Sequence, residues 1–145
     1  MGMSLEFCLD GRVKKVSLPV FSSPPGTDAP LLKRLLLPNG ELAQFADGAE
    51  PLRYVAAVEL RPGGIRGNHY HLHKHESLYL FSGALTLFVG DPGSGARGRL
   101  DMSAGDLAII PPGIAHALQV LQPGIAIEFA PQPFDPADTL RFALV

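Results

Sequence analysis

The sequence predicts an all-β fold, a sandwich or barrel of antiparallel strands, from three observations. Short runs of strand-forming residues alternate with turn-forming ones, 16 glycines and 14 prolines suit tight turns, and no segment with a helical period competes strongly. A chain of 145 residues has the length of one domain and can bury an apolar core without disulfides or a structural metal. We therefore expect residues 1–145 to form a single domain.

Alternating apolar runs predict the strands in order. The expected ranges are 13–18, 31–37, 41–45, 52–60, 77–81, 84–89, 106–110, 115–121 and 125–129. Gly- and Pro-rich breakers separate them at 22–26, 38–40, 61–64, 91–95, 111–113 and 122–124. Residues 91–98, rich in Gly and Ser, are expected as a mobile surface loop. From residue 131 onward prolines, which lack the ladder donor, predict an irregular tail.

The histidines predict a metal site. All five lie either at position 116 or at the alternating positions 69, 71, 73 and 75, just before Glu76. Transition metals bind neutral imidazoles and carboxylates that a rigid scaffold brings to one point. Residues i and i+2 of a strand share a face, so His69 and His71 can both point inward. Glu76 is out of phase with them, and a turn or bulge between Leu72 and His75 would return it to the same interior.

The fifth histidine belongs to a second segment, residues 105–116, which has the pattern of a strand, a Pro-Gly turn and a second strand. Alternation after the turn places His116, Leu118 and Val120 on one face. We therefore expect His116 to enter the same interior as His69 and His71.

These residues resemble the two motifs of the cupin family. They stand here as Gly67-Asn-His69-Tyr-His71-x4-Glu76-x6-Gly83 and Gly105-x5-Pro111-x-Gly113-x2-His116. Over about residues 52–130 the resemblance implies a cupin double-stranded β-helix, a jelly-roll barrel, preceded by the N-terminal strands of residues 1–51 and followed by the tail of residues 131–145. It also implies that His69, His71, Glu76 and His116 are the metal ligands. Val120 stands where cupins often have asparagine, which is not a ligand.

The implied cofactor is one divalent transition metal ion. The ligand set does not choose between zinc, manganese, iron, nickel and cobalt. Such an ion could polarise a carbonyl, stabilise an enolate or bind oxygen together with a substrate.

A narrower resemblance concerns the substrate. Residues 66–71, followed by a glutamate and Leu-Phe-Ser-Gly83, are similar to cupins of polysaccharide and nucleotide-sugar biosynthesis, including the carboxy-terminal cupin domain of capsular-polysaccharide reductases. This implies epimerisation or isomerisation of a keto-sugar nucleotide. The alternatives are an iron-dependent small-molecule dioxygenase and a non-catalytic sugar- or small-molecule-binding module. The expected apolar lining disfavours a richly hydrogen-bonded sugar pocket; it comprises Leu78, Leu80, Leu118 and Val120.

Three residues are candidates for substrate binding. Arg66 could hold a phosphate or carboxylate with both guanidinium arms, or be a solvated charge at the rim. His73 and His75 are expected on a turn at the barrel mouth, either solvated or in acid–base work and substrate contact. Glu128 alternates with small residues, and we expect it to be exposed. The catalytic base stays open between His73, His75 and Glu128.

Charge and patterning favour a small-molecule substrate as the partner. The net charge is −2 with scattered Lys and Arg, which gives no basic face for nucleic acid, and no apolar run approaches the length of a membrane span. A single cysteine and the lack of a basic start followed by an apolar run predict a cytoplasmic protein. Tyr79 and Phe81 should point out of the barrel, where either a homodimer face or the N-terminal segment would cover them.

Overall fold

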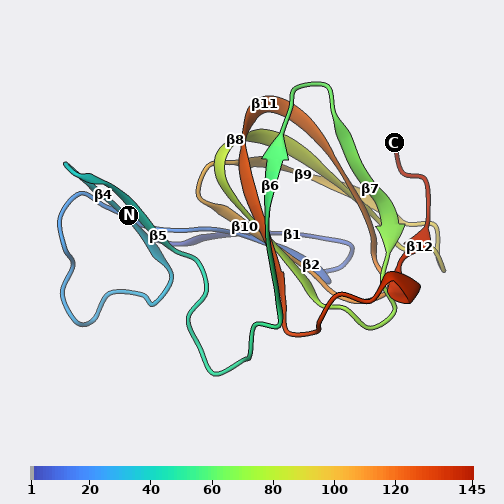
Figure 1. The fold of residues 1–145 in the computed structure, drawn as a ribbon, viewed down its shortest axis with the longest axis horizontal. Coiled ribbons are helices and arrows are strands. Elements are labelled where there is room, and N and C mark those ends of the chain that lie inside the picture. The colour runs from blue at the N-terminus through green and yellow to red at the C-terminus, as the bar shows by residue number, and fades with distance from the viewer. Residues whose placement is uncertain (1) are drawn as a thin grey trace.

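The computed structural model describes residues 2–145, in which nine strands form one sheet that folds over into a jelly-roll sandwich and three form a small sheet (Figure 1). The predicted all-β jelly roll is confirmed. In chain order the elements are β1 (Ser4–Cys8), β2 (Val13–Ser17), β3 (Val20–Phe21), β4 (Lys33–Leu37), β5 (Gly40–Gln44), β6 (Tyr54–Leu60), β7 (Ile65–Tyr70), β8 (Glu76–Gly90), β9 (Arg97–Ser103), β10 (Asp106–Ile110), β11 (Ala115–Ala130), the 3-10 turn η1 (Pro136–Asp138) and β12 (Leu140–Arg141). None of the helical residues among 2–145 forms a segment long and apolar enough to cross a bilayer.

Strands β8 and β11 pass through both layers of the sandwich and pair with each other along most of their length. In the first layer, β10 pairs with the start of β8, and β6 pairs with the end of β11. In the second layer, β9 pairs with the end of β8, and β7 pairs with the start of β11. Side chains from β6, β7, β8 and β11 can therefore meet between the layers.

The predicted strand breaks at residues 82–83 and 122–124 are wrong, because β8 and β11 run through them. Gly83 has a φ of 94°, and a Cβ there would lie 2.8 Å from the Gln122 carbonyl oxygen. A Cβ on Gly124 would overlap the Ser82 carbonyl group. Paired glycines thus let the two backbones approach and bulge where the strands change layer.

Five strands lie outside the predicted ranges: β1, β3, β7, β9 and β12. Strand β9 begins inside the loop expected at 91–98, and its buried side chains are only Leu100 and Met102 among polar or charged neighbours. Asp91 of the expected loop is tied to Arg12 by a 2.8 Å ion pair. In the tail expected to be irregular, β12 pairs with β7. Strand β12 depends on a partner distant in sequence, whereas β1 and β9 form hairpins with β2 and β8 but bury too few side chains to show a clear apolar pattern.

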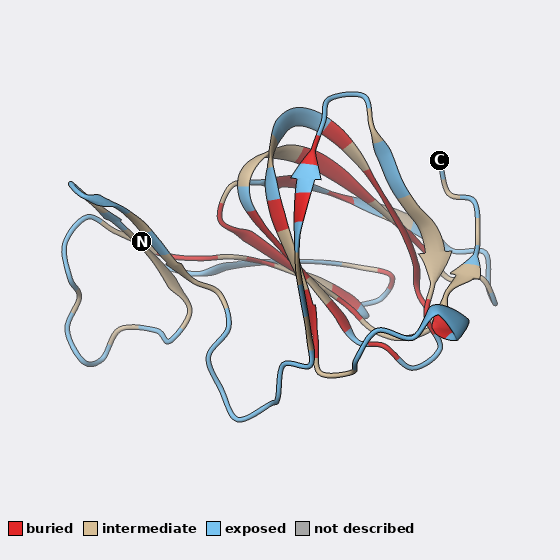
Figure 2. Cartoon of the chain, in the orientation of Figure 1, coloured by how far each residue is buried: buried red, intermediate tan, exposed pale blue. Residues whose placement is uncertain are grey.

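Buried side chains form an inner core between the layers and an outer cluster on the opposite face of the sheet. Figure 2 marks the buried residues in red along the strands. In the outer cluster Tyr79 is fully buried and stacks on Phe45, with ring centroids 4.3 Å apart. The N-terminal segment therefore covers Tyr79, whereas Phe81 remains 38% exposed. The homodimer stays a prediction. Because Tyr79 is already covered, less exposed apolar surface supports it.

Candidate metal centre and its cavity

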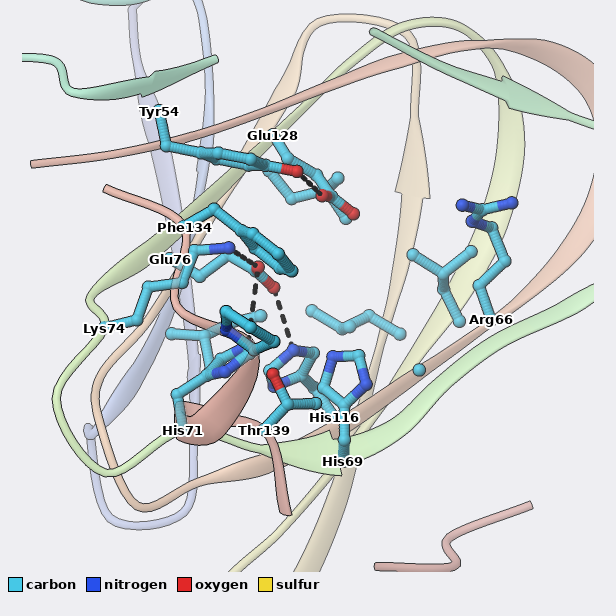
Figure 3. A pocket seen from close by; sticks show the side chains of 16 residues that line it. Tyr54, Arg66, His69, His71, Lys74, Glu76, His116, Glu128, Phe134 and Thr139 are labelled. Atoms are coloured by element: carbon cyan, nitrogen blue, oxygen red, sulfur yellow. Dashed lines mark hydrogen bonds and ion pairs between the residues drawn. The ribbon is translucent and has the colours of Figure 1, made fainter. Parts of the chain in front are cut away.

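Three of the predicted ligands meet between the layers. His69 lies on β7, His71 follows it, and His116 lies on β11, where it pairs with His69. One ring nitrogen from each lies within 4.8 Å of the other two (Figure 3). Imidazole nitrogens this close are suitably placed to bind one ion.

A bulge in β7 lies directly before His69. His116 pairs with His69 and Ala117 pairs with Gly67, so Asn68, with a φ of 57°, is the extra residue. Gly67 has a φ of 94°, and a Cβ there would lie 2.6 Å from the His116 carbonyl oxygen. The sequence predicted a phase change only between Leu72 and His75; the structure has a turn there and this bulge as well.

Hydrogen bonds prepare His71 to bind a cation. Its Nδ1 lies 2.6 Å from the Asp138 carbonyl oxygen, which can only accept, so Nδ1 carries the proton. In a neutral ring with this proton, Nε2 is an acceptor; it is buried and has no hydrogen-bond partner in residues 2–145. A bound cation would satisfy this orphaned lone pair.

The other two histidines differ in protonation. Burial, with the charges of His116 and His71, lowers the pKa of His69 to about 4, so His69 is a neutral imidazole near neutral pH. His116 places Nδ1 3.2 Å from the Ile114 carbonyl and Nε2 2.8 Å from Glu76 Oε2. Although burial lowers the pKa of His116, the contact with Glu76 outweighs it and the pKa is raised. An ion would displace the proton on Nε2.

Glu76 lies beside the three histidines, and its carboxylate already contacts other side chains. Its Oε1 lies 3.0 Å from Lys74 Nζ and 3.8 Å from His71 Nε2. Burial would raise the pKa of Glu76, but its contacts with His116 and Lys74 lower it below its usual range. Glu76 is thus a buried, ionised carboxylate, as ligation requires, with a buried lysine competing for one oxygen.

The histidines face a cavity of about 430 Å³. Of the expected apolar lining, Leu78 and Leu118 contribute, while Leu80 and Val120 are buried elsewhere in the core. Several polar side chains share the remaining lining with apolar ones, a feature that the sequence did not predict. Besides the predicted ligands, the lining comprises Tyr54, Arg66, Gly67, Lys74, Leu78, Leu87, Ile110, Leu118, Glu128, Phe134, Pro136 and Thr139.

Glu128 lines this cavity, so the expectation that it is exposed is wrong. Its Oε2 lies 3.5 Å from the Tyr54 hydroxyl, across the cavity from the histidines (Figure 3). Burial, and then the charge of Glu76, raise the pKa of Glu128. The small neighbours Ala126 and Ala130 were the sequence signal for an inward carboxylate. The cavity therefore holds two carboxylates whose pKa values are shifted in opposite directions.

The three predicted substrate-binding residues lie in different places. Arg66 lines the cavity, but His73 and His75 are exposed on the turn and lie outside the described lining. Their backbone N–H groups donate to Asp138 and Gln132. The prediction that the His73 and His75 side chains contact substrate thus finds no support in the geometry. Tail residues reach the cavity instead, which no local motif indicated.

Comparison with known proteins gives a family and a fold. The Cupin domain family model matches residues 56–128. No curated protein matches the sequence.

Solved structures resemble this one at low identity. The dTDP-4-dehydrorhamnose 3,5-epimerase of Sulfolobus tokodaii is 18% identical with a TM-score of 0.72, over 96% of this chain and 81% of the other. The dTDP-6-deoxy-D-glucose-3,5-epimerase of Legionella pneumophila, in complex with dTDP-4-keto-L-rhamnose, is 13% identical with a TM-score of 0.70, over 94% and 76%. A 3,4-ketoisomerase of Helicobacter canadensis is 12% identical with a TM-score of 0.65, over 76% and 86%. At these identities the likeness establishes the fold.

Proposed function

Because this chain belongs to the cupin family, we propose that it is a metal-dependent epimerase or isomerase of a keto-sugar nucleotide. His69, His71, His116 and Glu76 would hold one divalent transition metal ion. The observation that carries the proposal is a cavity with imidazole donors on one side and a carboxylate of raised pKa, Glu128, on the other. The activities of the epimerase and ketoisomerase structures named above belong to the same reaction class.

The donor set fits such an ion. His69 is neutral, His71 has a buried free lone pair, and Glu76 is ionised. When bound, the ion would polarise a substrate carbonyl oxygen and stabilise the negative charge that develops there.

Glu128 is placed to move the proton. A carboxylate with a raised pKa is a stronger base than an ordinary one, and it can abstract the acidic proton on the carbon beside a ketone. Burial and the nearby charge of Glu128 also raise the pKa of Tyr54, so this phenol keeps its proton and can orient Glu128. Returning the proton to the other face of the same carbon would epimerise the sugar; returning it elsewhere would isomerise it.

Arg66 would hold the remainder of the substrate. Its exposed guanidinium lies on the cavity wall, and a planar fork of donors matches the oxygens of a diphosphate. A cavity of about 430 Å³ is within the range of small-molecule sites. We therefore place the sugar beside the histidines and the diphosphate at Arg66.

The test is proton exchange. Zinc- or manganese-loaded protein is incubated with 4-keto-sugar nucleotides in heavy water, and NMR follows deuterium at the carbons beside the ketone. We expect carbon-bound deuterium with metal-loaded protein and none with protein denatured by heat. Absence of deuterium across a panel of nucleotides and metals would refute the proposal.

The contact between Lys74 and Glu76 favours a second candidate, a metal-independent epimerase. Both side chains are buried, and the ammonium lies 3.0 Å from the carboxylate oxygen and 4.2 Å from the centre of the Tyr54 ring. In that reaction Lys74 and protonated His116 would stabilise the charge on the substrate oxygen. Deuterium incorporation that persists after chelation, and is lost in Lys74→Met, would favour this candidate over the first.

A further inference from the structure

The C-terminal segment, residues 135–145, runs beside the strand that carries the histidine motif (Figure 1). Leu140 pairs with Tyr70, and the Phe142 N–H donates to the Asn68 carbonyl at 2.9 Å. The Asn68 side-chain oxygen in turn accepts from the Leu144 N–H at 2.8 Å. This segment therefore converts β7 from an edge strand into an interior one.

At the start of this segment one buried carboxylate holds the turn that follows β7. Asp138 Oδ1 accepts from the Leu72 N–H at 2.7 Å, and Oδ2 accepts from the N–H groups of His73 and Lys74, each at 3.1 Å. Its backbone carbonyl accepts from His71 Nδ1 at 2.6 Å. Four consecutive residues, 71–74, thus share Asp138 as a hydrogen-bond partner.

The neighbours of Asp138 fix its own position. Asp135 caps the 3-10 turn by accepting from the Ala137 N–H at 3.0 Å, and its carbonyl accepts from the Asp138 N–H at 3.0 Å. Asp138 is 7% exposed, so its carboxylate is removed from water and depends on these backbone donors. The turn in return depends on Asp138, because buried N–H groups without partners are costly.

We infer that Asp138 is a positioning residue of the metal centre. It fixes the backbone of residues 72–74, which separates His71 from Glu76 and carries Lys74, and its carbonyl sets the proton of His71 on Nδ1. The centre is therefore completed by a residue 67 positions beyond His71. The inference rests on the proposed function only in taking His71 as a metal ligand.

The test compares metal affinity in Asp138→Ala, Asp138→Asn and the matched control Gln132→Ala. Gln132 is a suitable control because its side chain also accepts from this turn, from the His75 N–H at 2.9 Å, without contacting His71. Cobalt(II) titration, followed by its visible absorption, should show about 10- to 100-fold weaker binding in Asp138→Ala. Gln132→Ala should change affinity by less than about threefold. Asp138→Asn should bind cobalt with an intermediate affinity, because its NH2 group would face a backbone N–H donor.

A second readout uses metal-free protein and does not depend on the proposed function. Long-range 1H–15N NMR of the His71 ring should show the Nδ1–H tautomer in the wild type and in Gln132→Ala, and a mixture of tautomers in Asp138→Ala. If the alanine variant does not fold, the result with Asp138→Asn decides the role of Asp138. Folded Asp138 variants with unchanged His71 tautomer and cobalt affinity would overturn the inference. Wild-type protein that binds no cobalt would refute the metal proposal, while the tautomer result would still decide the role of Asp138.

Discussion

The two walls of the cavity are prepared in opposite ways. On the histidine wall, formed by His69, His71 and His116, burial keeps His69 neutral and a carbonyl partner places the His71 proton on Nδ1, so both rings can offer a nitrogen to a cation. His116, beside Glu76, instead favours its protonated form. On the acid–base wall, formed by Tyr54 and Glu128, burial and a neighbouring negative charge favour holding a proton. In the proposed function, the sandwich would separate cation binding from proton transfer by placing them on different layers.

Glu128→Gln should have the largest effect, and only on the acid–base wall. The amide keeps the shape of the side chain but cannot take a proton, so the rate of deuterium incorporation should fall about 10²- to 10⁴-fold. Metal content should be unchanged, because Glu128 lies on the other wall. NMR exchange rates and metal analysis of the same sample check both; a variant that exchanges at the wild-type rate would remove Glu128 from the reaction.

Gly67→Ala tests the bulge behind the histidine wall. Its positive φ and the close His116 carbonyl should together lower the free energy of unfolding by about 2–4 kcal/mol. Gly63→Ala is the control, since Gly63 also has a positive φ, 78°, but no atom within 4 Å of an added Cβ. Its cost should be about 1–2 kcal/mol. Equal denaturation midpoints for the two variants would show that the close approach is not important.

The pH dependence of the deuterium-exchange rate should report the pKa of Glu128 on the acid–base wall. Glu128 must be ionised to act as a base, so the rate should rise with pH through its pKa. Because burial raises that pKa, the rise should lie above the pH at which an ordinary glutamate titrates. The profile is measured with metal content checked at each pH, and a rise centred at the ordinary glutamate value would contradict the assignment.

Tyr54→Phe should have the smallest effect. The 3.5 Å contact with Glu128 is long for a hydrogen bond, so its loss should slow exchange by only about two- to tenfold. The raised pKa of Glu128 should hardly change, because burial is its main cause. A loss as large as that of Glu128→Gln would instead make Tyr54 a proton donor to the substrate.

The histidine wall could be predicted because it depends on two compact motifs, and strand alternation with one turn suffices to converge His69, His71 and His116. The acid–base wall could not, because Glu128 and Tyr54 belong to strands whose inward face is decided by pairing across the sandwich. The sheet register pairs Glu128 with both Leu78 and Ala56. The small neighbours Ala126 and Ala130 are compatible with an inward Glu128, but local alternation alone does not choose the inward face.

The tail was predicted only in part, for a related reason. Its prolines correctly indicate that it is not a central strand, but Asp138 makes its contacts with a turn more than 60 residues away. The breaks expected at Gly83 and Gly124 failed because glycine permits both a chain reversal and a bulge within a continuing strand. The partner strand decides between the two outcomes.

The most direct test of the metal centre is the metal content of protein purified without a histidine tag, beside His71→Ala and His116→Ala. We predict about one metal ion per chain in the wild type and its loss in both variants, because each removes one of three converging donors. A wild-type protein that takes up none of zinc, manganese, iron, nickel or cobalt would contradict the account. Metal retained in His116→Ala would also contradict it, since the alternating histidines would then bind without the second motif.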